Sequence, residues 1–185
     1  MVFNFKKFRF LILFFLIIAF ICSASYYAVY NVLFPKKYSH FVEKYAYEYC
    51  LDSNFVYAVI KAESNFDEKA ASSKGARGLM QITESTGAWA AEKIGISDFE
   101  SYMLYDPETN IHIGCWYLDN LLKQYGNVDA AVAAYNAGSG NVDKWIEQNK
   151  DGSKELDREI IPFAETKNYV EKVDQYLKIY DFLYN

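Results

Sequence analysis

The feature that most constrains this chain is an apolar window without a formal charge near its amino terminus, residues 10–34. At about 1.5 Å of rise per residue, a helix of that length can cross a hydrocarbon core of roughly 30 Å. Lys6, Lys7 and Arg9 precede the window, and a basic cluster keeps its end of such a helix in the cytoplasm. We therefore expect residues 1–9 to be a cytoplasmic basic stub and residues 10–34 a single-pass transmembrane signal-anchor.

Two other interpretations of the same window stay open. The segment also fits a signal peptide cleaved at Ser23-Ala24-Ser25, since cleavage sites need small residues. The apolar character continues beyond that site, which favours retention of the segment. A lipid on Cys22 is the third interpretation, and the large Ile21 before the cysteine disfavours it. Under all three, the rest of the chain is extracytoplasmic, at the cell membrane or secreted.

The composition of the exported part excludes several classes of protein. Hydrophobic residues make up 52% of the chain and charged residues 23%, which excludes a disordered chain. After Arg9 there are 16 basic and 24 acidic residues, a net charge of −8 that excludes the basic face of a nucleic-acid binder. Aromatic residues reach 18%, which suits a flat ligand such as a carbohydrate.

Cysteine and histidine are scarce, with three and two residues. These numbers do not suffice for a disulfide framework or a zinc ribbon, so we expect no metal and no cofactor. Cys50 and Cys115 lie outside the apolar window and are candidates for one disulfide on the oxidising side of the membrane. Free, buried cysteines are the alternative.

Beyond residue 35, apolar residues recur at helical spacing and strand-like alternation is scarce. We expect one all-α domain over residues 38–183, with its three tryptophans, Trp89, Trp116 and Trp145, in the core. Capping and terminating residues mark the ends of three helices. These are Asp106-Pro107-Glu108 to Gly126, Thr83 or Ser85 to Gly95, and a last helix that begins near Pro162.

Glu63 is a carboxylate on the apolar side of a predicted helix. It comes four residues after Val59 and three after Ile60, which places it on the same helical face as these residues. Burial disfavours the charged form and raises the pKa of a carboxyl group, which suits a general acid near neutral pH. The alternative is a glutamate at a helix end that turns to water.

A glycine-containing segment follows, residues 70–81. Gly75 and Gly78 permit close approach of the backbone to a ligand. Met80 offers an adaptable apolar surface, and Gln81 offers both a donor and an acceptor for a sugar amide or hydroxyl. The alternative is an ordinary surface loop.

Two later segments carry further candidates. Tyr135 lies on a buried helical stripe with its hydroxyl available, and Asn136 can brace the turn that follows. Glu165 precedes Tyr169 by four residues, so it is expected to share an apolar stripe with it. The alternatives are a glycine C-cap in the first case and an acidic residue favoured by the helix dipole in the second.

Four segments in this order resemble the soluble lytic transglycosylase (SLT) domain family, which has a lysozyme-like fold. They are AVIKAESNF, SSKGARGLMQI, AAYNAGSGNVDKW and IPFAETKNYVEKV, and the resemblance spans about residues 38–180. It implies an all-α, lysozyme-like domain with Glu63 as the single catalytic glutamate. Two departures, Thr83-Glu84 in place of Met-Pro and Ser139 in place of proline, concern the wall of the cleft. The residues expected at the substrate are Ser64, Ser72, Ser73, Met80, Gln81, Tyr135, Asn136 and Glu165.

Members of that family cleave the β-1,4 bond between N-acetylmuramic acid and N-acetylglucosamine in peptidoglycan. The resemblance implies that Glu63 protonates the glycosidic oxygen and then takes the proton of the C6 hydroxyl, which leaves a 1,6-anhydro end. The expected partners are glycan strands and the membrane, without nucleic acid or metal. A hydrolytic muramidase on the same fold and a catalytically silent peptidoglycan-binding module are the alternatives.

Overall fold

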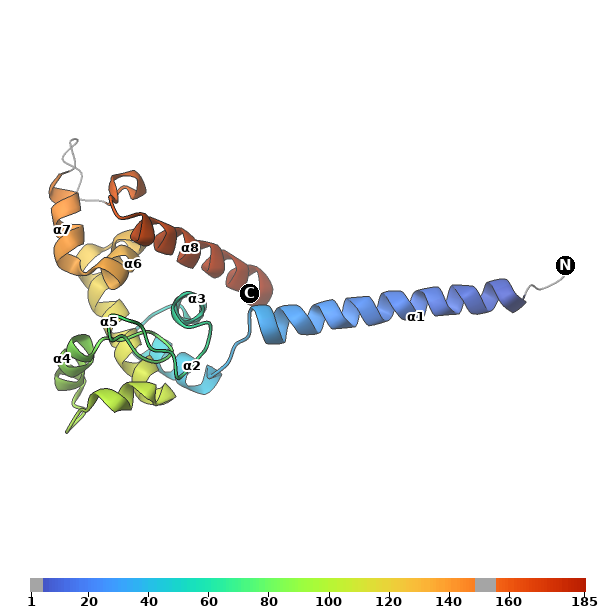
Figure 1. The fold of residues 1–185 in the computed structure, drawn as a ribbon, viewed down its shortest axis with the longest axis horizontal. Coiled ribbons are helices and arrows are strands. Elements are labelled where there is room, and N and C mark those ends of the chain that lie inside the picture. Colours follow the sequence, from blue (N-terminus) through green and yellow to red (C-terminus); the bar gives the residue numbers. More distant parts are fainter. Residues whose placement is uncertain (1–4, 149–155) are drawn as a thin grey trace. The chain divides into compact units, whose positions relative to one another are not determined.

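The computed structural model describes residues 5–148 and 156–185, and the chain divides into two compact units, Met1–Lys37 and Tyr38–Asn185 (Figure 1). The first four residues of the expected basic stub lie outside the described residues. Each unit is described separately.

The first unit is a long apolar helix. Helix α1, Phe5–Tyr27, continues as a π-helix over Ala28–Leu33. The span Arg9–Leu33 has a mean hydropathy of 2.4, and its apolar side chains are exposed all around the helix. Its length and composition are sufficient to cross a bilayer, and a signal sequence has the same properties.

The second unit is built from seven α-helices in its described residues. No strand is present in that part of the chain, so the expected all-α class is confirmed. Two short 3-10 helices, Ser101–Tyr105 and Arg158–Ile160, connect the longer elements. The α-helices are α2 (Ser39–Glu48), α3 (Ser53–Glu63), α4 (Glu84–Ile94), α5 (Pro107–Tyr125), α6 (Val128–Ala137), α7 (Ser139–Glu147) and α8 (Ala164–Tyr184).

The expected helix ends of α4 and α5 are confirmed by capping geometry. Asp106 Oδ2 accepts a hydrogen bond from the Thr109 backbone N–H at 2.9 Å, and α5 ends at Gly126 with φ at +63°. Thr83 Oγ1 accepts from the Thr86 N–H at 3.2 Å, so Thr83 is the cap of α4. These caps satisfy backbone groups that a helix end leaves without intrahelical partners.

Helix α3 is at the centre of this unit. It packs most extensively against α8, while α5 contacts α2, α4 and α6 (Figure 1). All residues from Asn54 to Ile60 are buried, so helix α3 is covered on nearly every side. Its carboxyl-terminal end is therefore fixed by packing on several helices.

The expectation that all three tryptophans lie in the core was wrong for Trp89. Trp145 is buried, but Trp89 is 41% exposed. Helix α4 packs through Gly87, Ala90 and Ala91, and Trp89 lies two residues from Gly87, on another face. Helical spacing alone did not reveal which face of α4 meets the core.

The cysteines are all free. Cys115 is fully buried in α5, whereas Cys50 is exposed. The structure therefore does not contain the candidate disulfide between them.

Candidate active site

Glu63 is the last residue of α3, and the chain leaves the helix through an unusual turn. Asn65 and Phe66 both adopt positive φ angles, +52° and +66°. A bulky residue in this left-handed region is strained by roughly 1–3 kcal/mol, and it persists only where its surroundings hold it. Phe66 is buried, with its ring centroid 6.4 Å from that of Tyr57. Packing thus fixes the turn directly after Glu63.

The Glu63 carboxyl group has a perturbed pKa. Burial raises this pKa to about 7, against the opposing effects of a hydrogen bond from Tyr169 and the positive charge of Lys172. The Tyr169 hydroxyl donates to Glu63 Oε1 at 2.6 Å. At neutral pH the group therefore holds a proton in a large share of molecules and releases it in the rest, as acid–base catalysis needs.

Tyr169, the hydrogen-bond donor to Glu63, is a candidate site residue that the sequence analysis missed. It lies on α8, where only 8% of it is exposed, and it was considered only as part of the apolar stripe of that helix. A buried tyrosine usually finds a partner for its hydroxyl. That requirement, together with a buried carboxylate on another helix, is the signal that could have paired Tyr169 with Glu63.

A second contact joins α8 to the end of α3. Lys172 Nζ donates to the Ala62 carbonyl at 2.7 Å. Lys172 comes three residues after Tyr169, so the two side chains project from the same face of α8. Helix α8 thereby holds both the backbone before Glu63 and its carboxyl group.

Tyr135 is near Glu63, but its hydroxyl has another partner. The hydroxyl donates to the Met80 carbonyl at 2.7 Å, and it was expected to be available. Burial raises the pKa of Tyr135 well above its usual value, and the negative charge of Glu63 adds to this effect. The geometry therefore places Tyr135 beside the acid, with its hydroxyl fixing the segment that contains Met80.

The segment Gly78–Gln81 is held by side chains that the sequence analysis had assigned to the substrate. Ser64 Oγ donates to the Leu79 carbonyl at 2.8 Å. Gln81 Nε2 donates to the carbonyls of Ala70 and Gly78 at 3.1 and 2.9 Å. These bonds connect the segment to the end of α3 and to the preceding loop.

Met80 is fully buried, so its side chain fills the core instead of forming an exposed apolar surface. It packs on Gly114, where a Cβ atom would collide with the Met80 sulfur. Asn110, also fully buried, accepts from the Met80 N–H at 2.8 Å. Its Nδ2 donates to the carbonyls of Arg77 and Leu104 at 2.9 and 2.8 Å. The sequence analysis missed Asn110. The signal for it was an amide side chain directly before the buried Ile111.

Three further candidates are Ser72, Ser73 and Asn136. Ser72 and Ser73 are in an exposed loop, where Ser72 Oγ accepts from the backbone N–H of Lys74 at 3.3 Å. Asn136 Oδ1 accepts from the buried Thr166 hydroxyl at 2.8 Å, which joins the end of α6 to α8.

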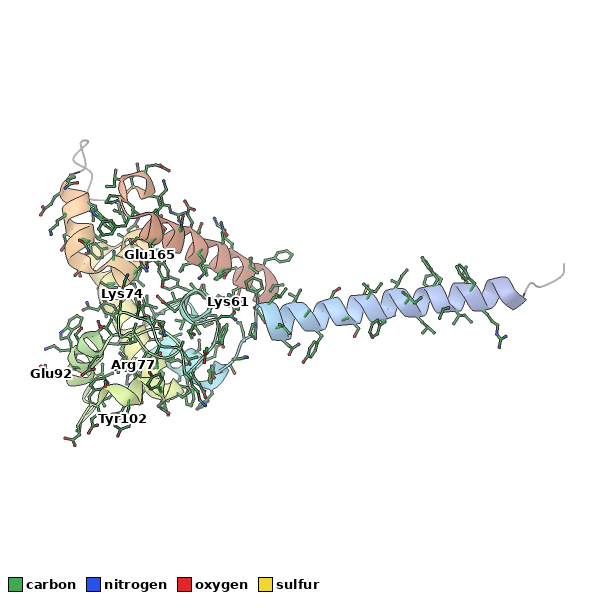
Figure 2. The ribbon with its side chains drawn as sticks, viewed as in Figure 1. Lys61, Lys74, Arg77, Glu92, Tyr102 and Glu165 are labelled. Carbon is green, nitrogen blue, oxygen red and sulfur yellow. The ribbon has the colours of Figure 1, made fainter. Side chains whose placement is uncertain are left out.

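Glu165 does not share the apolar face with Tyr169. Its side chain is 73% exposed, with Oε1 3.6 Å from Lys74 Nζ (Figure 2). It lies in the first turn of α8, which points its side chain away from the packed face that begins at Thr166. An exposed carboxylate at this position stays accessible to a ligand.

Two other carboxylates that could have served as a second acid at the site have other partners. Glu68 Oε2 accepts from the Tyr38 hydroxyl at 2.9 Å, and Asp106 caps α5. Within the described residues, no group of three or more His, Cys, Asp or Glu side chains could hold a metal ion. The chemistry available at this site is that of one carboxyl group with a raised pKa.

Comparison with known proteins identifies the family. Residues 40–157 match the family described as "Transglycosylase SLT domain". The chain is 37% identical over 147 residues to the soluble lytic murein transglycosylase of Salmonella typhimurium, covering 77% of this chain and 23% of that protein. It is 28% identical to a membrane-bound lytic murein transglycosylase C of Cronobacter sakazakii, covering 78% of this chain and 46% of that protein.

A solved structure shares the fold. It is an inactive mutant of the lytic transglycosylase Slt from Pseudomonas aeruginosa, with a TM-score of 0.76 and 34% identity, covering 83% of this chain and 25% of that one. The chain thus spans about a quarter of the length of its first relatives. The family match and these similarities confirm the resemblance seen in the sequence: the chain belongs to the transglycosylase SLT domain family.

Proposed function

We propose that this chain is a lytic transglycosylase that cleaves the β-1,4 bond between N-acetylmuramic acid and N-acetylglucosamine in peptidoglycan without water, leaving 1,6-anhydro-N-acetylmuramic acid ends. The observation that carries the proposal is the partly buried Glu63, with a pKa raised to about 7 and a hydrogen bond from Tyr169. The names of the relatives support it, and so does the inactive Slt mutant, in which a glutamate is replaced by glutamine.

In the first step Glu63 is the acid. Its proton moves to the glycosidic oxygen as the bond between that oxygen and C1 breaks. The 2-acetamido group of the substrate stabilises the positive charge that develops at C1, so the reaction needs no second carboxylate from the protein. The partial burial of Glu63 keeps the acid protonated at a pH where an exposed glutamate has lost its proton.

In the second step Glu63 is the base. Its carboxylate takes the proton of the C6 hydroxyl as that oxygen bonds to C1, which closes the anhydro ring and restores the acid. Because the hydroxyl belongs to the same sugar, its effective concentration exceeds that of a diffusing nucleophile. Between the two steps, the Tyr169 hydroxyl and the Lys172 charge stabilise the anionic form of Glu63.

The eight candidate substrate residues fall into two groups. The exposed side chains, Ser72, Ser73 and Glu165, are proposed to contact the glycan directly. The others are proposed to shape the site, since their side-chain or backbone groups are engaged with neighbouring segments. These are Ser64, Met80, Gln81, Tyr135 and Asn136.

We further propose that α1 anchors the protein in the bacterial cell membrane, with the catalytic domain, residues 38–183, on the extracytoplasmic side. The apolar span Arg9–Leu33 and the basic residues before its apolar part support this topology. Anchoring raises the local concentration of an acidic domain at the anionic wall, which its own net charge would not do. Cleavage of the segment would instead release the domain.

The test compares the full-length chain with Glu63→Gln on purified sacculi, with the products identified by mass spectrometry. The unchanged chain is expected to release anhydro-muropeptides, which lack one water relative to the products of a hydrolytic muramidase. Glu63→Gln is expected to lose activity by about 10²–10⁴-fold, the usual share of a general acid–base group. Glu92→Gln, at a side chain that is 75% exposed on α4, is the matched control and keeps its activity. Undiminished lysis by Glu63→Gln contradicts the assignment, and absence of any product from the unchanged chain supports a silent module.

A further inference from the structure

Helix α4 presents an indole ring to solvent. Trp89 is 41% exposed, and its ring meets the ring of Trp116 edge-on, with centroids 4.8 Å apart and an interplanar angle of 77°. It meets Tyr117 at 6.2 Å and 81°. Trp116 and Tyr117 are partly buried on α5 and hold the indole in place. We call Trp89, Trp116 and Tyr117 the aromatic patch.

The aromatic patch is continuous with the candidate active site. The ring centroid of Tyr117 lies 5.2 Å from that of Tyr135. Tyr135 in turn bonds to the Met80 carbonyl, and its pKa responds to the charge of Glu63. Successive ring contacts therefore lead from the neighbour of the catalytic acid to the exposed face of Trp89.

The chemistry of such a surface suits a sugar polymer. The face of an indole ring carries partial negative charge, and the C–H groups on the face of a pyranose carry partial positive charge. An exposed indole ring that is continuous with a candidate active site suits a binding function. The patch has no formal charge, so it adds no repulsion toward a strand that carries carboxylates.

We propose that the aromatic patch is a sugar-binding subsite, in which Trp89 stacks on a pyranose ring of the glycan strand at a position away from the bond that Glu63 cleaves. This proposal rests on the proposed function, because it takes the peptidoglycan glycan strand as the occupant. Stacking there holds the strand along the protein surface while the scissile bond lies at Glu63.

The experiment measures strand binding and turnover separately. The probe is a purified glycan strand of alternating N-acetylglucosamine and N-acetylmuramic acid from which the stem peptides have been removed. Binding is measured with the full-length chain carrying Glu63→Gln, with and without Trp89→Leu, which keeps an apolar side chain but removes the aromatic face. Tyr47→Ala, at an aromatic residue that is 89% exposed on α2, is the matched control.

Loss of the indole is expected to weaken strand binding by about three- to tenfold, in line with the energy of one aromatic stacking contact. In the chain with Glu63 intact, Trp89→Leu is expected to raise KM by a similar factor and to leave kcat nearly unchanged. Tryptophan fluorescence of the Glu63→Gln chain is expected to change on strand binding, and Trp89→Phe is expected to remove most of that change.

Two results overturn the proposal. One is equal strand affinity with and without Trp89→Leu together with an unchanged fluorescence response in Trp89→Phe. The other is a change of oligomeric state in Trp89→Leu, measured by analytical ultracentrifugation, which would assign the patch to protein contacts. If the unchanged chain cleaves sacculi while either result holds, only the subsite is wrong. If it cleaves nothing, the proposed function fails as well.

Discussion

Replacement of Glu63 by glutamine is expected to stabilise the fold at neutral and alkaline pH while it lowers activity by about 10²–10⁴-fold. The carboxyl group is partly buried, and its pKa is raised from 4.5 to about 7. A raised carboxyl pKa means that the folded chain keeps a proton that the unfolded chain releases. The free energy of unfolding therefore falls as pH rises from about 4.5 to 7, and it stays lowered above that range.

The size of the effect follows from the pKa shift. Each pKa unit corresponds to about 1.4 kcal/mol, so the full shift would amount to about 3 kcal/mol above pH 7. Glu63 is not fully buried, and water around the carboxylate screens its charge. The destabilisation by the charged form is therefore reduced to about 2 kcal/mol. Glutamine has a similar shape and still offers an oxygen to the Tyr169 hydroxyl, but it carries no charge. For a chain of this size, the melting temperature of Glu63→Gln at pH 8 should exceed that of the unchanged chain by about 4–8 °C.

Thermal unfolding of the full-length chain, followed by near-ultraviolet circular dichroism at pH 4 and pH 8, measures this difference. At pH 4 both side chains are neutral, so the two melting temperatures should nearly coincide. Glu92→Gln, at an exposed position, should change the melting temperature little at either pH value. If the gain of Glu63→Gln is the same at pH 4 as at pH 8, burial of the charge is not its cause and the reasoning is refuted.

Two further variants test the surroundings of the acid. Tyr169→Phe removes the hydrogen bond that lowers the pKa of Glu63, so this pKa should rise. The pH above which activity declines should therefore also rise. An unchanged pH–rate profile would contradict this role of Tyr169. Asn110→Ala leaves the buried Met80 N–H and Leu104 carbonyl without their partner and removes one of two hydrogen bonds to the Arg77 carbonyl. It should lower the free energy of unfolding by about 3 kcal/mol or more in urea titration. Asn120→Ala, partly exposed on the same helix, should change it by less than about 0.5 kcal/mol.

The sequence predicted the helices well where local chemistry decides their ends. Asp106 and Thr83 cap their helices as expected because a side-chain oxygen can reach the first backbone N–H groups from within the same segment. Glu63 was also found from local spacing, since residues three and four apart share a face of the helix. These features depend on a few neighbouring residues and need no knowledge of the tertiary packing.

Features that depend on contacts between distant segments were not predicted. The pairing of Tyr169 with Glu63 spans 106 residues, and the bond between Tyr135 and Met80 spans 55. The exposure of Trp89 and of Glu165 depends on which faces of their helices are covered by other helices. Residue spacing within one helix does not show this. Motif resemblance named the candidate residues but did not predict their hydrogen-bond partners.

The position of Glu63 at the end of α3 suits the proposed function, in which one carboxyl group is both acid and base. Deep in the helix, burial without compensation would hold the proton too tightly for the group to act as a base. At the last residue, α8 can approach from the side, so that Tyr169 and Lys172 lower the pKa that burial raises. The pKa of Glu63 therefore lies near neutrality because burial raises it while the contacts from α8 lower it. A change in α8 alone should thus alter the pH dependence of catalysis without touching α3, as Tyr169→Phe is expected to do.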